Sequence, residues 1–102
     1  MANTDVTITS PSATKSKADV GSITVSKNDT ITWINATTDV MIVFFPHDKL
    51  GNSQNHFFRS IQPGDSDTIK VTTSKKRTYR YGVFCHDTNS FATGSDLEII
   101  VQ

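Results

Sequence analysis

The side chains best suited to metal chemistry in this chain are one cysteine, three histidines and one internal methionine. Thiolate, imidazole and thioether groups are donors that copper and related transition metals accept. The sequence therefore allows a copper site whose candidate ligands are Cys85, His86, His47, His56 and Met41.

The alternative is that these residues have ordinary structural roles. A lone cysteine in a small domain commonly packs as a small apolar side chain. His47 and His56 lie in a polar segment, where solvated surface histidines are expected. Neighbouring residues of a strand point to opposite faces, so Cys85 and His86 do not easily share a metal unless the chain turns there. Both interpretations stay open at this point.

Catalytic arrangements are missing from the sequence. Cys85, His86 and Asp87 resemble the parts of a triad, but three consecutive residues cannot hydrogen-bond to one another as a Cys–His–Asp relay. The chain contains no Gly-x-Ser-x-Gly turn, no phosphate-binding glycine loop and no His-Glu-x-x-His motif. We expect no catalytic residues and no enzymatic activity.

Length and charge narrow the remaining classes. A chain of 102 residues forms one domain, here expected over residues 1–102. Its formal net charge of zero argues against binding nucleic acid through bulk charge. A single cysteine excludes an internal disulfide, and the longest apolar run, residues 40–45, is too short to cross a bilayer. The first residues lack the features of a signal peptide, which leaves a cytosolic protein or an exported domain without its leader.

The composition predicts an all-β domain. Serine and threonine make up about a quarter of the chain, and the apolar residues are mostly valine, isoleucine and aromatics, which suit a pleated sheet. Runs of two-residue period between turn signals predict seven short strands, at residues 6–9, 23–25, 30–35, 40–45, 68–71, 78–84 and 97–101. Residues 12–21 and 85–95 are expected to be surface connections, and 47–60 to be irregular. Seven strands at this spacing predict a Greek-key β-sandwich.

Two sandwich families have about this many strands. An immunoglobulin-like domain would explain Trp33 and the tyrosine before Cys85, but its bridge needs a second cysteine. Residues 21–35 (GSITVSKNDTITWIN), the Phe58-x-Ser60 segment with the Pro-Gly turn after it, and the Tyr-rich run 78–85 occur in the order typical of cupredoxins. The chain therefore resembles the cupredoxin family over about four-fifths of its length.

That resemblance implies a type 1 copper site with one cysteine, two histidines and a weak axial ligand. The sequence departs from this pattern. The position of the first histidine falls on Val40 or Met41, and Thr88 or Asn89 stands where the second is expected. No methionine follows Cys85. The resemblance therefore implies a cupredoxin-like fold whose usual copper ligands have been lost.

The function expected from these residues is a non-enzymatic, copper-free binding or structural domain. Its partner would be a protein, recognised through the loops, and the domain is expected to be monomeric and exported to the periplasm or cell exterior. The alternative is a copper-binding electron carrier with a rearranged site at Cys85, and a third possibility is an immunoglobulin-like adhesion domain. A basic cluster at Lys75-Lys76-Arg77 with Arg80 fits either a solvated turn or an acidic partner. Asn28 and Asn35 begin N-glycosylation sequons.

Overall fold

A computed structural model describes residues 2–45, 57–73, 76–93 and 97–102. These residues form strands and turns, with no helix among them. The strands are β1 (Asn3–Ser12), β2 (Lys15–Ala18), β3 (Ser22–Val25), β4 (Thr30–Asn35), β5 (Met41–Phe45), β6 (Phe57–Ile61), β7 (Ser66–Lys70), β8 (Arg77–Arg80), β9 (Gly82–Cys85), β10 (Ser90–Phe91) and β11 (Glu98–Val101).

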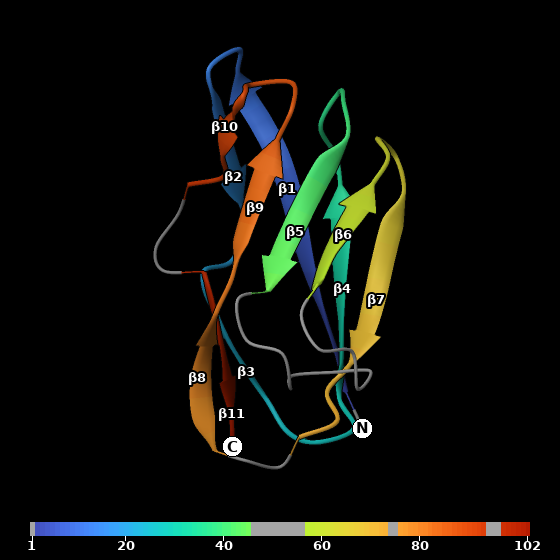
Figure 1. Ribbon diagram of the computed structural model, residues 1–102, viewed down its shortest axis with the longest axis vertical. Coiled ribbons are helices and arrows are strands. Elements are labelled where there is room, and N and C mark those ends of the chain that lie inside the picture. Colours follow the sequence, from blue (N-terminus) through green and yellow to red (C-terminus); the bar gives the residue numbers. More distant parts are fainter. Residues whose placement is uncertain (1, 46–56, 74–75, 94–96) are drawn as a thin grey trace.

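The strands make three hydrogen-bonded groups that pack as a β-sandwich (Figure 1). One sheet has the order β2-β1-β4-β7, and a second has the order β10-β9-β5-β6. A third group, β3-β11-β8, lies at the end that carries both termini (Figure 1). Strands β1 and β4 pair in parallel, as do β3 and β11, although none of these are neighbours in sequence. The all-β sandwich predicted from the sequence is confirmed.

Alternation of apolar and polar residues decides which side chains enter the core. In β4 the side chains of Ile31, Trp33 and Asn35 are buried, while the residues between them are half-exposed. The Trp33 ring meets the Tyr81 ring edge-on, with centroids 5.5 Å apart. Because β4 lies in one sheet and Tyr81 joins β8 to β9, this contact ties the two layers together.

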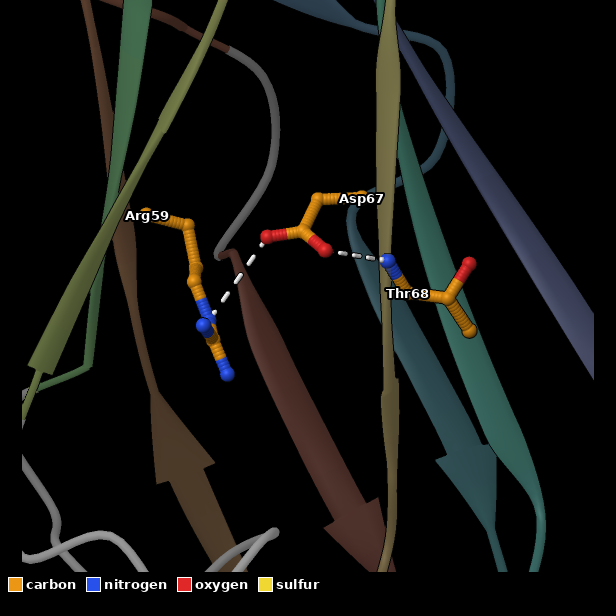
Figure 2. Close-up of polar contacts among 3 residues, drawn as sticks. All are labelled: Arg59, Asp67 and Thr68. Atoms are coloured by element: carbon orange, nitrogen blue, oxygen red, sulfur yellow. Dashed lines mark hydrogen bonds and ion pairs between the residues drawn. The ribbon is translucent and has the colours of Figure 1, made fainter.

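Side-chain and backbone contacts join the layers at their margins. Arg59 of β6 and Asp67 of β7 lie opposite the buried residues Val43 and Trp33, so both face the interior at the margin of the core. Figure 2 shows the ion pair, with Arg59 Nε 3.6 Å from Asp67 Oδ2, and the Thr68 amide donating to the same carboxylate at 2.9 Å. On the other side, Thr93 lies beside β2, and its amide donates to the Ser16 carbonyl at 2.7 Å.

Three strands were not predicted. Lys15–Ala18 was expected to be a surface connection but forms β2, because Ser16 and Ala18 turn inward and their lysine neighbours turn out. Phe57–Ile61 forms β6 beside β5, although residues up to Ser60 were expected to be irregular. Ser90–Phe91 forms the short strand β10 within the expected loop. In addition, the strand expected at 78–84 is divided at Tyr81 into β8 and β9.

The Pro-Gly turn predicted from the sequence is present. Gly64 has a φ of 84°, and the Asp65 amide donates to the Gln62 carbonyl at 3.0 Å, as the Pro-Gly pair requires. In the turn at residues 26–29, Asn28 has a φ of 79°, which asparagine tolerates better than most residues.

Candidate functional site

The candidate site begins with Cys85 at the end of β9. Cys85 pairs with Met41, the first residue of β5, and both residues have no exposed surface. Residues directly opposite in neighbouring strands point to the same face of the sheet. The Cys85 thiol and the Met41 thioether therefore lie side by side on the inner face, at the edge of the core. Of the two residues expected to replace the first histidine, Met41 is the one that lies opposite Cys85.

The Ser16 hydroxyl lies beside the Cys85 thiol and connects it to further hydroxyl groups. Ser16 of β2 has no exposed surface, and its Oγ lies 3.0 Å from Ser10 Oγ and 2.8 Å from Thr88 Oγ1. Thr88 Oγ1 in turn lies 2.9 Å from Ser90 Oγ. These residues form a hydroxyl chain across β1, β2 and the turn before β10. Sequence reasoning missed it, because Ser16 and Thr88 meet only once the chain is folded; the alternation in Lys15–Ala18 was the available signal.

The environment keeps the Cys85 thiol protonated at neutral pH. Burial raises the pKa of Cys85, hydrogen bonding by Ser16 opposes that shift, and the charge of Asp87 adds to it. A protonated thiol is a poor nucleophile and a poor metal ligand. The site therefore does not activate the sulfur.

His86 lies on the other side of the sheet from the thiol. Its side chain is exposed and meets the Phe84 ring edge-on, with centroids 5.3 Å apart. Its amide donates to the Val40 carbonyl at 3.1 Å, which holds the backbone extended from Cys85. His86 and Cys85 are thus adjacent in sequence but are not brought together as metal ligands.

The described residues do not provide the donors of a type 1 copper site. They offer Cys85 and Met41 facing inward but no inward-facing imidazole, and within them no group of three His, Cys, Asp or Glu side chains could hold a metal ion. His47 and His56, the other candidate ligands, lie outside the described residues. The described residues next to these histidines are Phe45 and Phe57, which pair with each other. Phe45 is four residues after Met41 on β5, so this pair lies about 13 Å along the strand from Met41.

A shallow depression of about 320 Å³ opens beside the hydroxyl chain. Its lining comes from the C-terminal end of β1 and from the three turns after β1, β4 and β9, and consists of Ser10, Ser12, Ala13, Thr38, Asp87 and Thr88. The Asp87 carboxylate accepts long hydrogen bonds from the Thr38 amide and hydroxyl, at 3.5 and 3.4 Å. Such a surface suits hydrogen bonding to a polar group of a partner.

Asn35 shapes the loops next to this depression. Its Nδ2 donates to the carbonyls of Asp39 and Ile61 at 2.9 and 2.8 Å. Its Oδ1 accepts from the amide and hydroxyl of Thr37 at 2.9 and 2.6 Å. Because Asn35 is fully buried and uses both ends of its amide, its sequon cannot carry a glycan in the folded protein. Asn28 is exposed.

Aromatic side chains gather on the outer face of β5, β9 and β10. Phe44 is 37% exposed and Phe91 is 56% exposed, and their ring centroids lie 6.1 Å apart. Phe84 lies 5.2 Å from Phe91 and connects the pair to His86. From the sequence, Phe44 was expected to contribute to the core, with an exposed aromatic patch as the alternative; the structure places Phe44 in this cluster on the outer face of the sheet.

Comparison with known proteins supports the fold. No family model matches the chain, and no curated protein matches it in sequence. The described part of the chain contains no helix that could span a membrane. A solved structure of an amicyanin mutant in its Cu(I) form has a TM-score of 0.67 at 20% identity, covering 98% of this chain and 82% of that chain.

Other amicyanin structures give similar values. An oxidised mutant has the same TM-score of 0.67 at 20% identity, again over 98% of this chain and 82% of its own. A second oxidised mutant has a TM-score of 0.63 at 18% identity, over 95% of this chain and 81% of its own. Identity at this level establishes architecture rather than activity. The chain has a cupredoxin-like β-sandwich fold.

Proposed function

We propose that this protein is a non-enzymatic binding module that uses a cupredoxin-like fold without type 1 copper. The observation that supports this best is Met41, which occupies the buried position opposite Cys85 where the resemblance implies a histidine. A thioether and a protonated thiol leave that position apolar. The residues around it then stabilise the sandwich, and the loops and outer faces are free to recognise a protein partner.

The environment of Cys85 adds to this proposal. The thiol is enclosed by Met41 and the Ser16 hydroxyl, and its raised pKa opposes metal binding, which requires the thiolate. Export to the periplasm or cell exterior, and a monomeric state, are part of the same proposal. A leader peptide in the precursor gene and sedimentation of the purified chain test these two points.

A copper titration tests the main proposal. Cu(II) is added to the reduced protein while visible absorption and thermal stability are measured. We expect no intense charge-transfer band and no change in Tm. An intense band that Cys85→Ser abolishes would show that copper binds the thiolate, and the copper-free proposal would then be wrong.

The second candidate is an electron carrier with a rearranged copper site. Two observations favour it: the solved structures that share this fold include amicyanin in its Cu(I) form, and Cys85 and Met41 are both soft donors facing one position. Met41→Leu is the matched control, because it removes the thioether and nearly conserves the volume. A copper band that Met41→Leu shifts and Cys85→Ser removes would support the carrier.

A further inference from the structure

At the end of the sandwich that carries both termini lie the turn between β3 and β4, the end of β7 and the start of β8, and these segments contain four cationic residues (Figure 1). They are Lys27, Lys70, Lys76 and Arg77, here called the cationic end. The basic cluster noted in the sequence contained Lys76 and Arg77, and the fold adds Lys27 and Lys70. Lys75 lies outside the described residues.

Backbone hydrogen bonds hold these residues together. The Asn28 amide donates to the Val71 carbonyl, and the Val71 amide donates to the Asp29 carbonyl, both at 2.8 Å. This double contact brings the turn that carries Lys27 beside the end of β7, where Lys70 lies. Arg77 pairs with Val101 of β11, which pairs with Val25 of β3. The backbone of Arg77 therefore lies two strand spacings, about 10 Å, from β3, the strand that leads into the Lys27 turn.

The four side chains are exposed, and the Asp29 carboxylate and the chain's C-terminal carboxylate lie at the same end. None of the four cationic side chains makes an ion pair within the described residues, whereas Arg59 pairs with Asp67 and Arg80 lies 3.9 Å from Glu98. The Asp29 carboxylate accepts hydrogen bonds from the amides of Ala2 and Ser26, at 3.0 and 2.9 Å, instead of a lysine.

The guanidinium of Arg77 is positioned by an aromatic ring. Its central carbon lies 5.2 Å from the centroid of Tyr79, two residues further along β8. A cation held over a ring loses less conformational freedom on binding than a free one. Arg77 is therefore the member of the cationic end best prepared for a partner.

The opposite end of the sandwich carries carboxylates. The turns next to the depression contain Asp39, Asp65 and Asp87, although Lys15, which pairs with Ser12, lies beside them. A long polyanion that extended over the molecule would meet these carboxylates. A compact acidic surface can contact the cationic end alone.

We propose that the cationic end docks an acidic surface patch of a protein partner. This inference rests on the proposed function, because it names the partner chemistry of the binding module. Charge complementarity of this kind mainly accelerates association and selects orientation, and it weakens as salt increases.

The test is an NMR titration of the 15N-labelled full chain with a short poly-glutamate peptide at near-physiological salt. We expect amide shifts centred on Lys27, Lys70 and Arg77 that decrease as salt is raised. K70E/R77E should weaken binding by about tenfold or more. K15E/K17E makes the same charge change on β2 and should leave binding within about twofold.

Several outcomes would overturn the inference. One is equal weakening by both double variants, and another is a set of shifts away from the cationic end. Tighter binding at that end to duplex DNA, or to phosphatidylglycerol vesicles, than to the peptide would assign it to a nucleic acid or a membrane instead. The copper titration is independent of these results, so failure here leaves the copper-free proposal standing, and the reverse also holds.

Discussion

The two ends of the sandwich are built in different ways. Around Cys85 and Asn35, polar and sulfur-containing groups are buried and satisfy one another. At the cationic end the cationic side chains are exposed, backbone hydrogen bonds join the segments that carry them, and the Tyr79 ring positions Arg77. If the proposals above are right, the Cys85 end contributes mainly to stability and the cationic end mainly to recognition. Substitutions should therefore have large effects on folding at the first and small ones at the second.

The largest effect is expected from Asn35→Ala. It leaves the Thr37 amide and the Ile61 carbonyl without their buried partner, while the Thr37 hydroxyl still donates to the Asp39 carbonyl at 2.9 Å. Each orphaned group costs about 1–3 kcal/mol, so unfolding in urea should show a loss of about 2–6 kcal/mol. Asn28→Gly, at an exposed position with positive φ, is the control and should be close to neutral. Similar losses in both variants would contradict the contrast between the ends.

Met41→Ala should have the next largest effect. The side chain is fully buried against Cys85, and removing it leaves a cavity that costs about 2–5 kcal/mol. Met41→Leu should cost less than about 1.5 kcal/mol, because the volume is nearly kept. A loss with Met41→Leu as large as with Met41→Ala would show that the sulfur itself matters.

The alkaline side of the stability profile should report on Cys85. Burial raises the pKa of this thiol above its ordinary value of 9.0, so folding is favoured while the thiol is protonated. That contribution is complete below pH 9 and is lost as the pH rises through the raised pKa. Cys85→Ala should therefore flatten the decline in the free energy of unfolding above pH 9. If urea unfolding shows the same decline with pH above 9 in Cys85→Ala as in the unmodified protein, the decline does not come from Cys85.

The acid side should report on Asp29 in the turn at the other end. Hydrogen bonds from the amides of Ser26 and Ala2 lower the pKa of this carboxyl below its ordinary value of 3.8. Its contribution is complete above pH 3.8 and is lost as the pH falls through the lowered pKa. Asp29→Asn should flatten the decline in stability below pH 3.8. A parallel decline in both proteins would assign the acid sensitivity to other groups.

The smallest effect on folding is expected from K70E/R77E. Both side chains are exposed and lack ion pairs within the described residues, so stability should change by about 0.5 kcal/mol or less. The same variant should lose peptide binding. A large change in the urea midpoint would mean that the cationic end also supports the fold.

The sequence predicted those parts of the fold in which side chains alternate clearly. Thr30–Asn35 forms a strand as expected, and the turn at Gly64 has the positive φ that its Pro-Gly pair indicated. Strand β2 was missed because its inward residues, Ser16 and Ala18, are small and gave no apolar signal. Strand β6 was missed because it forms by pairing with β5 along its length, and the local sequence does not show that pairing.

The candidate site was predicted in part. The resemblance implied a histidine at the position of Val40 or Met41, and the register with β9 shows that Met41 is the residue opposite Cys85. The hydroxyl chain joins Ser16 to Thr88, residues 72 positions apart, so the alternation in Lys15–Ala18 could turn Ser16 inward but could not identify its partner. The grouping of Lys27 and Lys70 with Arg77 likewise depends on strand register. Local alternation indicates which way a side chain points, but its distant neighbours follow from the topology.

The contact between Trp33 and Tyr81 allows unfolding to be followed by intrinsic fluorescence. Trp33 is the single tryptophan, has no exposed surface and touches a ring anchored in the opposite layer. Its fluorescence should shift to longer wavelength when water reaches the indole. Energy transfer from Tyr81 to Trp33 should fall when the two layers separate. The wavelength of Trp33 emission then reports hydration of the core, and the tyrosine emission reports separation of the sheets.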